Sequence, residues 1–96
     1  MTAVAPTIEN ARRAAEALVS HGAGRVVLFG SVARGDATEH SDIDLVAIYD
    51  DIDYSKRQAI AVPAEATATE AAGCSVDVLV TDRPEWKMRT TRVRTR

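Results

Sequence analysis

Residues 25–49 read RVVLFGSVARGDATEHSDIDLVAIY, and this stretch decides the fold. It contains two segments that are rich in β-branched, aliphatic and aromatic residues, at Arg25–Phe29 and at Asp42–Tyr49. Such segments are typical of strands that are buried in a sheet. The sequence therefore predicts two strands, joined by a mostly polar segment at residues 30–41.

The joining segment begins with Gly30 and Ser31, directly after the first strand. A glycine here permits a tight turn and a close approach of the backbone to a ligand. Residues 32–34 can form a short helical turn that Gly35 closes, and residues 36–41 indicate a loop. A serine that opens a helical turn offers its hydroxyl and nearby N–H groups to an anion, although a plain turn uses the same residues.

The sequence on either side of this stretch predicts two helices. Apolar residues recur at helical spacing between Thr7, a good N-cap, and Gly22, a good C-terminal stop. Residues 54–72 are rich in Ala, Glu, Gln and Lys, which favours a second helix. Pro63 interrupts this segment, so we expect either a kink or two short helices.

A third strand is predicted over Cys74–Val80, and a turn at residues 83–86 leads into a final helix. This order of elements fits the α/β (α+β) class, with a small mixed sheet and flanking helices. The long helix between the second and third strands favours a crossover connection over a hairpin. The 96 residues allow one domain, which we expect to span residues 1–96.

The composition is that of a globular protein, since 46% of the residues are apolar. The single cysteine, Cys74, excludes an internal disulfide framework and a cysteine-based zinc cluster. No apolar run approaches the ~20 residues of a membrane-spanning helix, and the first residues lack the pattern of a signal peptide. We therefore expect a reduced, cytoplasmic protein that does not associate with membranes.

The net charge of −2 hides an uneven distribution along the chain. Residues 1–82 carry 6 basic and 13 acidic side chains, a net charge of −7. Residues 83–96, which we call the basic tail, carry 6 basic side chains and 1 acidic side chain, a net charge of +5. Such a tail can bind phosphate or an acidic partner, or it can form a solvated helix face.

Asp42 and Asp44 alternate with Ile43 and Leu45, so the two carboxylates belong to one face of the second strand, about 7 Å apart at Cα. Unpaired, they would repel each other, and a divalent cation removes that penalty. Mg²⁺ commonly uses one or two carboxylates together with substrate phosphates. The other interpretation is a strand face turned to solvent, which is disfavoured because Asp is a poor strand former.

Asp77 lies within an otherwise apolar strand, Val-Asp-Val-Leu-Val. A buried, isolated carboxylate is costly unless it is paired or bound to a metal. We therefore predict that Asp77 is buried and has a role at the site. The alternative is an edge strand on which Asp77 faces water.

Residues 30–46, GSVARGDATEHSDIDLV, resemble the signature of the polymerase-β-like nucleotidyltransferase superfamily. In that signature a Gly-Ser pair is followed by Asp-x-Asp. The Ala-Arg-Gly and Ser-Asp-Ile-Asp-Leu details are similar to those of the minimal nucleotidyltransferases (MNT), and the resemblance covers residues 8–82. It implies a nucleotidyltransferase-like fold and an enzyme that transfers a nucleoside monophosphate, AMP from ATP, to a hydroxyl group.

The resemblance also implies roles for individual residues. Gly30 and Ser31 would hold the triphosphate, and Arg34 is a further candidate for a phosphate contact, with a surface role as its alternative. The acids would bind two Mg²⁺ ions, and one of them would also help to activate the acceptor hydroxyl. These metal-binding and catalytic acids are Asp42, Asp44 and Asp77, of which Asp77 is the one that would assist the acceptor.

Three departures from the family accompany the resemblance. Val32 occupies a position where many relatives have a basic or polar residue, so we expect no phosphate contact from it. Many relatives also continue past the position of residue 96, so we expect this chain to be either an unusually short member or a truncated one. We also expect the helical acceptor-binding domain of larger nucleotidyltransferases to be absent here.

Minimal nucleotidyltransferases often pair with HEPN-type toxins, which are ribonucleases, and act as antitoxins by adenylylating them. The resemblance therefore implies a protein acceptor, with a HEPN-type toxin as the partner, and we expect no direct binding of nucleic acid. Two alternatives stay open. One is a non-catalytic binding module, which would not need three intact acids, and the other is an enzyme that modifies a small molecule such as an aminoglycoside.

Overall fold

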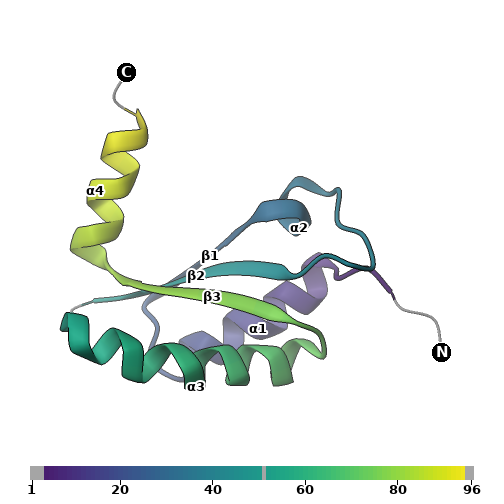
Figure 1. Ribbon diagram of the computed structural model, residues 1–96, viewed down its shortest axis with the longest axis horizontal. Coiled ribbons are helices and arrows are strands. Elements are labelled where there is room, and N and C mark those ends of the chain that lie inside the picture. The colour runs from purple at the N-terminus through teal and green to yellow at the C-terminus, as the bar shows by residue number, and fades with distance from the viewer. Residues whose placement is uncertain (1–3, 51, 95–96) are drawn as a thin grey trace.

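The computed structural model describes residues 4–50 and 52–94 (Figure 1). A three-stranded mixed sheet with flanking helices confirms the predicted fold class. The elements are α1 (Ile8–Ser20), β1 (Arg25–Phe29), α2 (Gly30–Arg34), β2 (Ile43–Tyr49), α3 (Tyr54–Ala72), β3 (Val76–Asp82) and α4 (Arg83–Arg94).

The central strand of the sheet is β2, which pairs antiparallel with β1 and parallel with β3. α3 forms the crossover between the two parallel strands, as its length predicts. This topology places the end of β1 and the starts of β2 and β3 at one end of the sheet. Phe29 lies opposite Asp44 there, and Asp44 lies opposite Asp77. We call this end, defined by these three residues, the acid end.

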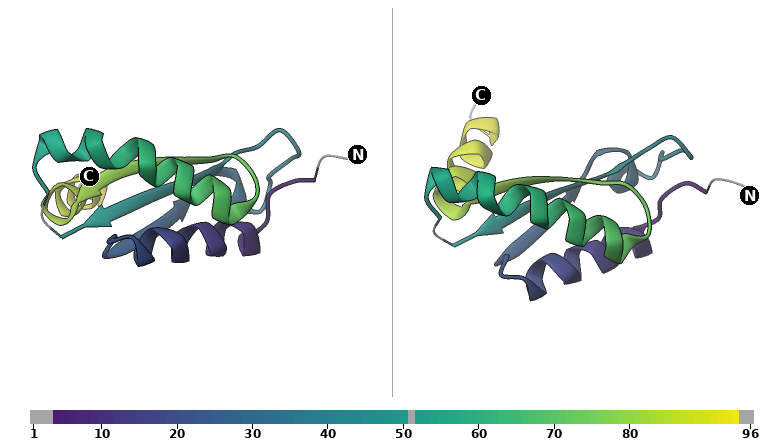
Figure 2. Two further views of the ribbon diagram at one scale, coloured as in Figure 1. Left: turned by 90° about the horizontal axis from the view of Figure 1, so that it is seen from below. Right: turned by 60° about the horizontal axis from the view of Figure 1, so that its bottom comes forward.

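The core lies between one face of the sheet and the helices α1 and α3, which run side by side against it (Figure 2). Ile43 and Leu45 of β2 are 0% and 1% exposed on this face. The buried positions of the two helices are mostly alanines, whose small side chains let the helices approach each other and the sheet. These alanines are Ala11, Ala14, Ala64, Ala68 and Ala72.

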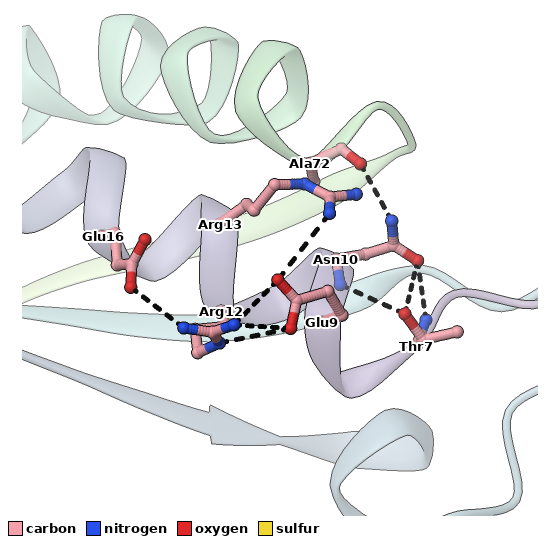
Figure 3. Close-up of polar contacts among 7 residues, drawn as sticks. All are labelled: Thr7, Glu9, Asn10, Arg12, Arg13, Glu16 and Ala72. Carbon is pink, nitrogen blue, oxygen red and sulfur yellow. Dashed lines mark hydrogen bonds and ion pairs between the residues drawn. The ribbon is translucent and has the colours of Figure 1, made fainter.

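The first helix begins and ends where the sequence predicts. Thr7 and Asn10 form a capping box, in which the Asn10 N–H donates to Thr7 Oγ1 at 3.1 Å (Figure 3). Asn10 Nδ2 also donates to the carbonyl of Ala72 at 3.1 Å, which ties the start of α1 to the end of α3. At the other end, Gly22 adopts φ +116° and donates its N–H to the Val19 carbonyl.

The opposite face of the sheet, which we call the open face, leaves Phe29 and Leu79 44% and 43% exposed. β1 is accordingly an edge strand with half-buried and exposed side chains. The prediction that Arg25–Phe29 is a buried strand is therefore wrong. The composition of β1 is that of a buried strand. The strand nevertheless pairs on one edge only, and α1 and α3 cover the face of the sheet opposite the open face, so these two helices do not cover its open-face side chains.

Two further boundaries differ from the prediction. α3 is assigned as one helix across Pro63, so the alternative of two short helices is wrong. Packing of its alanine face against α1 and the sheet holds the helix together through the residue that lacks an N–H. The third strand covers Val76–Asp82 instead of Cys74–Val80, because pairing with β2 continues to the register pair Tyr49–Asp82.

α4 starts at Arg83 directly after β3, without the predicted turn at residues 83–86. Asp82 ends the strand and caps the helix, since its Oδ1 accepts a hydrogen bond from the Glu85 N–H at 3.0 Å. Pro84 fits the first turn, where its missing N–H leaves no bond unmade. α4 projects from the end of β3, away from the side that α1 and α3 occupy (Figure 1).

The basic tail coincides with α4 as far as Arg94. Residues 95–96 and the side chains from residue 89 onward lie outside the described part of the chain, so a role for their charges stays a prediction. Across the residues the structure describes, no helix combines the length and the apolar character that crossing a membrane requires.

Candidate active site

The Gly-Ser part of the sequence motif lies against its Asp-x-Asp part. The contact is made by Gly30, the first residue of α2, and Asp44 of β2. Its backbone adopts φ +80°, a conformation that side chains with a Cβ rarely take. A Cβ at this position would also collide with Asp44 Oδ2. Glycine is therefore needed twice over, for its backbone angle and for the space that the Asp44 carboxylate occupies.

The predicted acids meet at the acid end of the open face. Asp44 and Asp77 are register partners on adjacent parallel strands, which places their Cα atoms about 4.8 Å apart. Asp42 lies two residues before Asp44, immediately outside β2, and strand alternation assigns it to the same face. Asp42 is exposed and Asp44 half-buried, so both carboxylates are accessible from solvent.

Asp77 is exposed, so the prediction that it is buried is wrong. β3 is an edge strand and alternates between buried residues on the core face and exposed ones on the open face. Partial desolvation nevertheless raises the pKa of Asp77 above its ordinary value, and the charges of Asp42, Glu65 and Asp44 raise it further. Its carboxylate therefore holds a proton more readily than an isolated one.

Glu65 is a neighbour of the site that the sequence did not reveal. It comes from α3, and its Oε2 accepts a hydrogen bond from the N–H of Val78 at 3.3 Å on the free edge of β3. Its charge contributes to the raised pKa of Asp77. Glu65 belongs to no sequence motif, because an acid on the exposed side of a helix is ordinary and only the crossover brings α3 beside β3.

α2 is held in place by Val32, which is 3% exposed and belongs to the core cluster. This packing accounts for the apolar residue at position 32. Ser31 follows Gly30 and is half-buried. Arg34 is exposed, and its Nε lies 3.3 Å from Asp36 Oδ2. The structure therefore places Gly30 against Asp44, whereas Arg34 is engaged with the loop that follows α2.

The donor set fits a hard divalent cation, which prefers carboxylate oxygens. Asp44 and Asp77 lie side by side, and the repulsion that raises the pKa of Asp77 is the penalty that a cation would remove. Within residues 4–50 and 52–94, no group of three His, Cys, Asp or Glu side chains already has the spacing of a formed metal site. The arrangement offers carboxylates for a cation beside a tight backbone turn that a phosphate can approach.

The chain is similar to known proteins in sequence and in fold. Residues 8–95 match the family described as the nucleotidyltransferase domain. A proposed protein adenylyltransferase of Methanocaldococcus jannaschii is 58% identical over 31 residues. That segment is 31% of this chain and 31% of the relative, so the match spans about a third of the length of either protein.

A solved structure shares the fold. The crystal structure of a proposed nucleotidyltransferase from Sulfolobus solfataricus superimposes with a TM-score of 0.57. The superposition covers 84% of this chain and 71% of the other, at 24% sequence identity. At that identity the likeness concerns the arrangement of helices and strands.

Proposed function

The chain belongs to the nucleotidyltransferase domain family, and from that premise we propose that it transfers AMP from ATP to a hydroxyl group of another protein. The observation that carries the proposal is the convergence at the acid end. Asp44 and Asp77 are register partners there, and Gly30 turns so closely past Asp44 that no side chain fits between them. This is the pairing of a phosphate-approaching turn with metal-binding acids that nucleotidyl transfer requires.

In the proposed mechanism, Gly30 and Ser31 bind the triphosphate through backbone N–H groups and the Ser31 hydroxyl, and Arg34 contributes when it leaves Asp36. Asp42, Asp44 and Asp77 hold Mg²⁺, with two ions as the expected number. When bound, Mg²⁺ supplies positive charge that stabilises the attacking and leaving oxygens of an in-line displacement. Positioning and charge neutralisation account for most of the catalysis, so few residues suffice.

The transfer step forms a bond between the acceptor oxygen and the α-phosphorus of ATP. The bond from that phosphorus to the bridging oxygen breaks, and pyrophosphate leaves with the electron pair. The acceptor proton passes to the Asp77 carboxylate, directly or through one water. The raised pKa of Asp77 supports this role, because a carboxylate that holds a proton more readily is a better base.

A protein acceptor is supported by the name of the Methanocaldococcus jannaschii relative, which describes a proposed protein adenylyltransferase. We include in the proposal the partner that the resemblance to minimal nucleotidyltransferases implies, a HEPN-type toxin. On this view the chain acts as an antitoxin by modifying its partner. The acceptor hydroxyl would belong to the toxin and would reach Asp77 from the solvent side of the open face.

The test is incubation of the protein with Mg²⁺, a lysate and ATP that is labelled at either the α- or the γ-phosphate. We expect an α-labelled protein band and no band from γ-labelled ATP. The variant Asp42→Asn with Asp44→Asn should abolish the band. A matched control, Glu16→Gln with Glu70→Gln, changes the charge equally on exposed helix faces and should retain it. A labelled small molecule, or no transfer at all, would contradict the proposal.

A further inference from the structure

A groove lies at the end of the open face opposite the acid end. It has a volume of about 970 Å³ and lies between the sheet and the start of α4. The argument depends on six of its lining residues, which are Arg25, Ile48, Asp50, Arg83, Trp86 and Lys87. We call it the α4 groove.

The α4 groove and the acids share one face of the sheet. Ile48 lies four residues after Asp44 in β2, so strand alternation turns both side chains to the same side. Arg25 is the register partner of Ile48, as Phe29 is of Asp44. Four residues of strand separate the groove from the acid end by about 13 Å. An extended polypeptide that spans this distance needs about four residues as well.

The side chains of the groove are mainly basic and aromatic. Among the lining residues that the structure describes, Arg25, Arg83 and Lys87 are basic and Asp50 is acidic. Arg83 Nε lies 3.5 Å from Asp50 Oδ1, and both side chains are largely exposed. Residues 1–82 have a net charge of −7, so this groove is a positive site on an otherwise acidic body. It therefore attracts acidic ligands.

The wall that α4 contributes is fixed by polar contacts. Arg57 links α3 to the start of α4, with Nη1 at 2.5 Å from Glu85 Oε1 and Nη2 at 3.1 Å from Asp82 Oδ2. The Thr81 hydroxyl donates to Glu85 Oε1, and Asp82 caps the helix. These contacts fix the direction in which α4 leaves the sheet, so the groove exists before any ligand binds.

We propose that the α4 groove binds an acidic, extended segment of the acceptor protein and so presents an acceptor hydroxyl to the acid end. The inference rests on the proposed function and adds the chemistry of the acceptor. The surface between groove and acids is apolar, with the half-buried Val27 and the exposed Leu79 in register on either side of Val46, which is buried. A polypeptide can cover that strip with apolar side chains. A nucleic acid would place its phosphates next to the carboxylates of the acid end, which repel them.

The experiment measures binding without ATP or transfer. The probe is a fluorescein-labelled peptide of about ten residues that alternates Glu with Ser, and its comparison probes alternate Lys with Ser or are an oligothymidylate of similar length. We expect the anisotropy to rise with the Glu-Ser peptide, and to rise less with either comparison probe. Binding should weaken as the salt concentration is raised from about 0.05 M to about 0.5 M.

The decisive variant is Arg25→Glu, which reverses an exposed charge at the start of β1. We expect the dissociation constant of the Glu-Ser peptide to rise about five-fold or more. The matched control is Arg13→Glu, which makes the same change on α1, on the other side of the sheet. It should leave the constant within about two-fold, the difference that general charge repulsion can produce.

Three outcomes would overturn the proposal. These are equal weakening by both variants, stronger binding of the oligothymidylate, and displacement of the peptide by ATP, which would make the groove part of the nucleotide site. The experiment distinguishes failure of the groove from failure of the proposed function. A protein that transfers AMP but binds no acidic peptide would refute the groove alone, and one that binds the peptide but transfers nothing would refute the enzyme alone.

Discussion

At the scale of single residues, the site depends on a glycine that two neighbours constrain. Gly30 must turn the chain out of β1 with a positive φ, and it must leave room for the Asp44 carboxylate in the neighbouring strand. Gly73 has a similar φ of +78°, at the end of α3, but no atom lies within 4 Å of the Cβ it lacks. Substitutions at Gly30 and Gly73 therefore distinguish the cost of the backbone conformation from the cost of a steric collision.

We expect Gly73→Ala to lower the free energy of unfolding by about 1 kcal/mol, the cost of a left-handed conformation with a Cβ. Gly30→Ala adds a collision with a carboxylate and should cost more than about 3 kcal/mol in all. Urea denaturation of both variants provides the measurement. Equal losses would mean that the Asp44 carboxylate moves aside freely and that the tight approach has no role.

Asp77 provides a prediction that depends on pH. Its pKa is raised in the folded state, chiefly by desolvation and then by Asp42, Glu65 and Asp44. As pH rises through about 4, the unfolded chain loses this proton first, so the charged carboxylate destabilises the fold at neutral pH. Asp77→Asn should therefore stabilise the protein above about pH 5, by less than about 1 kcal/mol because the group is exposed.

The same substitution at Asp82 should have the opposite sign. The N–H of Glu85 and the guanidinium of Arg57 lower the pKa of Asp82. Its carboxylate therefore contributes stability above about pH 4, which is lost as pH falls through the lowered pKa. Thermal denaturation of Asp77→Asn and Asp82→Asn from about pH 3 to about pH 7 should show opposite trends. Parallel trends would contradict the electrostatic description of the site.

At the scale of elements, the direction of α4 depends on a charge network at its first turn. Arg57, Asp82 and Glu85 have side chains that are 20%, 13% and 32% exposed, so solvent screens them less than surface ion pairs. On α1, Arg12 forms ion pairs with Glu9 and Glu16 in which all three side chains are more than half exposed. The two arginines have similar partners but different surroundings.

Arg57→Met should lower the thermal midpoint clearly, because it leaves two carboxylates close together without their cation. Arg12→Met should leave the midpoint nearly unchanged, as is usual for exposed ion pairs. Arg57→Met should also weaken peptide binding in the α4 groove, since α4 loses its link to α3. A midpoint that falls equally in the two variants would show that the network does not fix α4.

At the scale of the whole molecule, the sheet has two unlike faces. The face toward α1 and α3 contains the core, and the open face contains the acids and the α4 groove. Leu45 is 1% exposed on the first face and Leu79 is 43% exposed on the second. Most of the core thus lies on one face of the thin sheet, and the proposed site lies on the other.

Leu45→Ala should therefore reduce the free energy of unfolding by about 2–5 kcal/mol, the usual cost of a cavity in a core. Leu79→Ala removes the same atoms from a half-open position and should cost less than about 1 kcal/mol. Denaturant titration of both variants checks this division. A large loss at Leu79 would mean that the open face is more fully packed than its exposed fraction indicates.

Sequence alone determined the elements that local rules govern. Thr7, Gly22, Gly35 and Gly73 mark helix ends whose capping depends on adjacent residues, and the helices they bound lie where the sequence predicts them. The alternation of Asp42 and Asp44 with apolar residues likewise predicted that the two acids share one face of β2, since the period of a strand is a local property. The motif residues at 30–46 were sufficient to indicate the family.

The tertiary structure decided everything that depends on which segments become neighbours. Strand order left Arg25–Phe29 at an edge and Asp77 exposed, although the composition of both segments indicated burial. The register set Asp77 beside Asp44, the crossover brought Glu65 to the site, and the cap at Asp82 turned α4 to form a groove. These features arise from contacts between residues far apart in the chain, which no local pattern of side chains encodes.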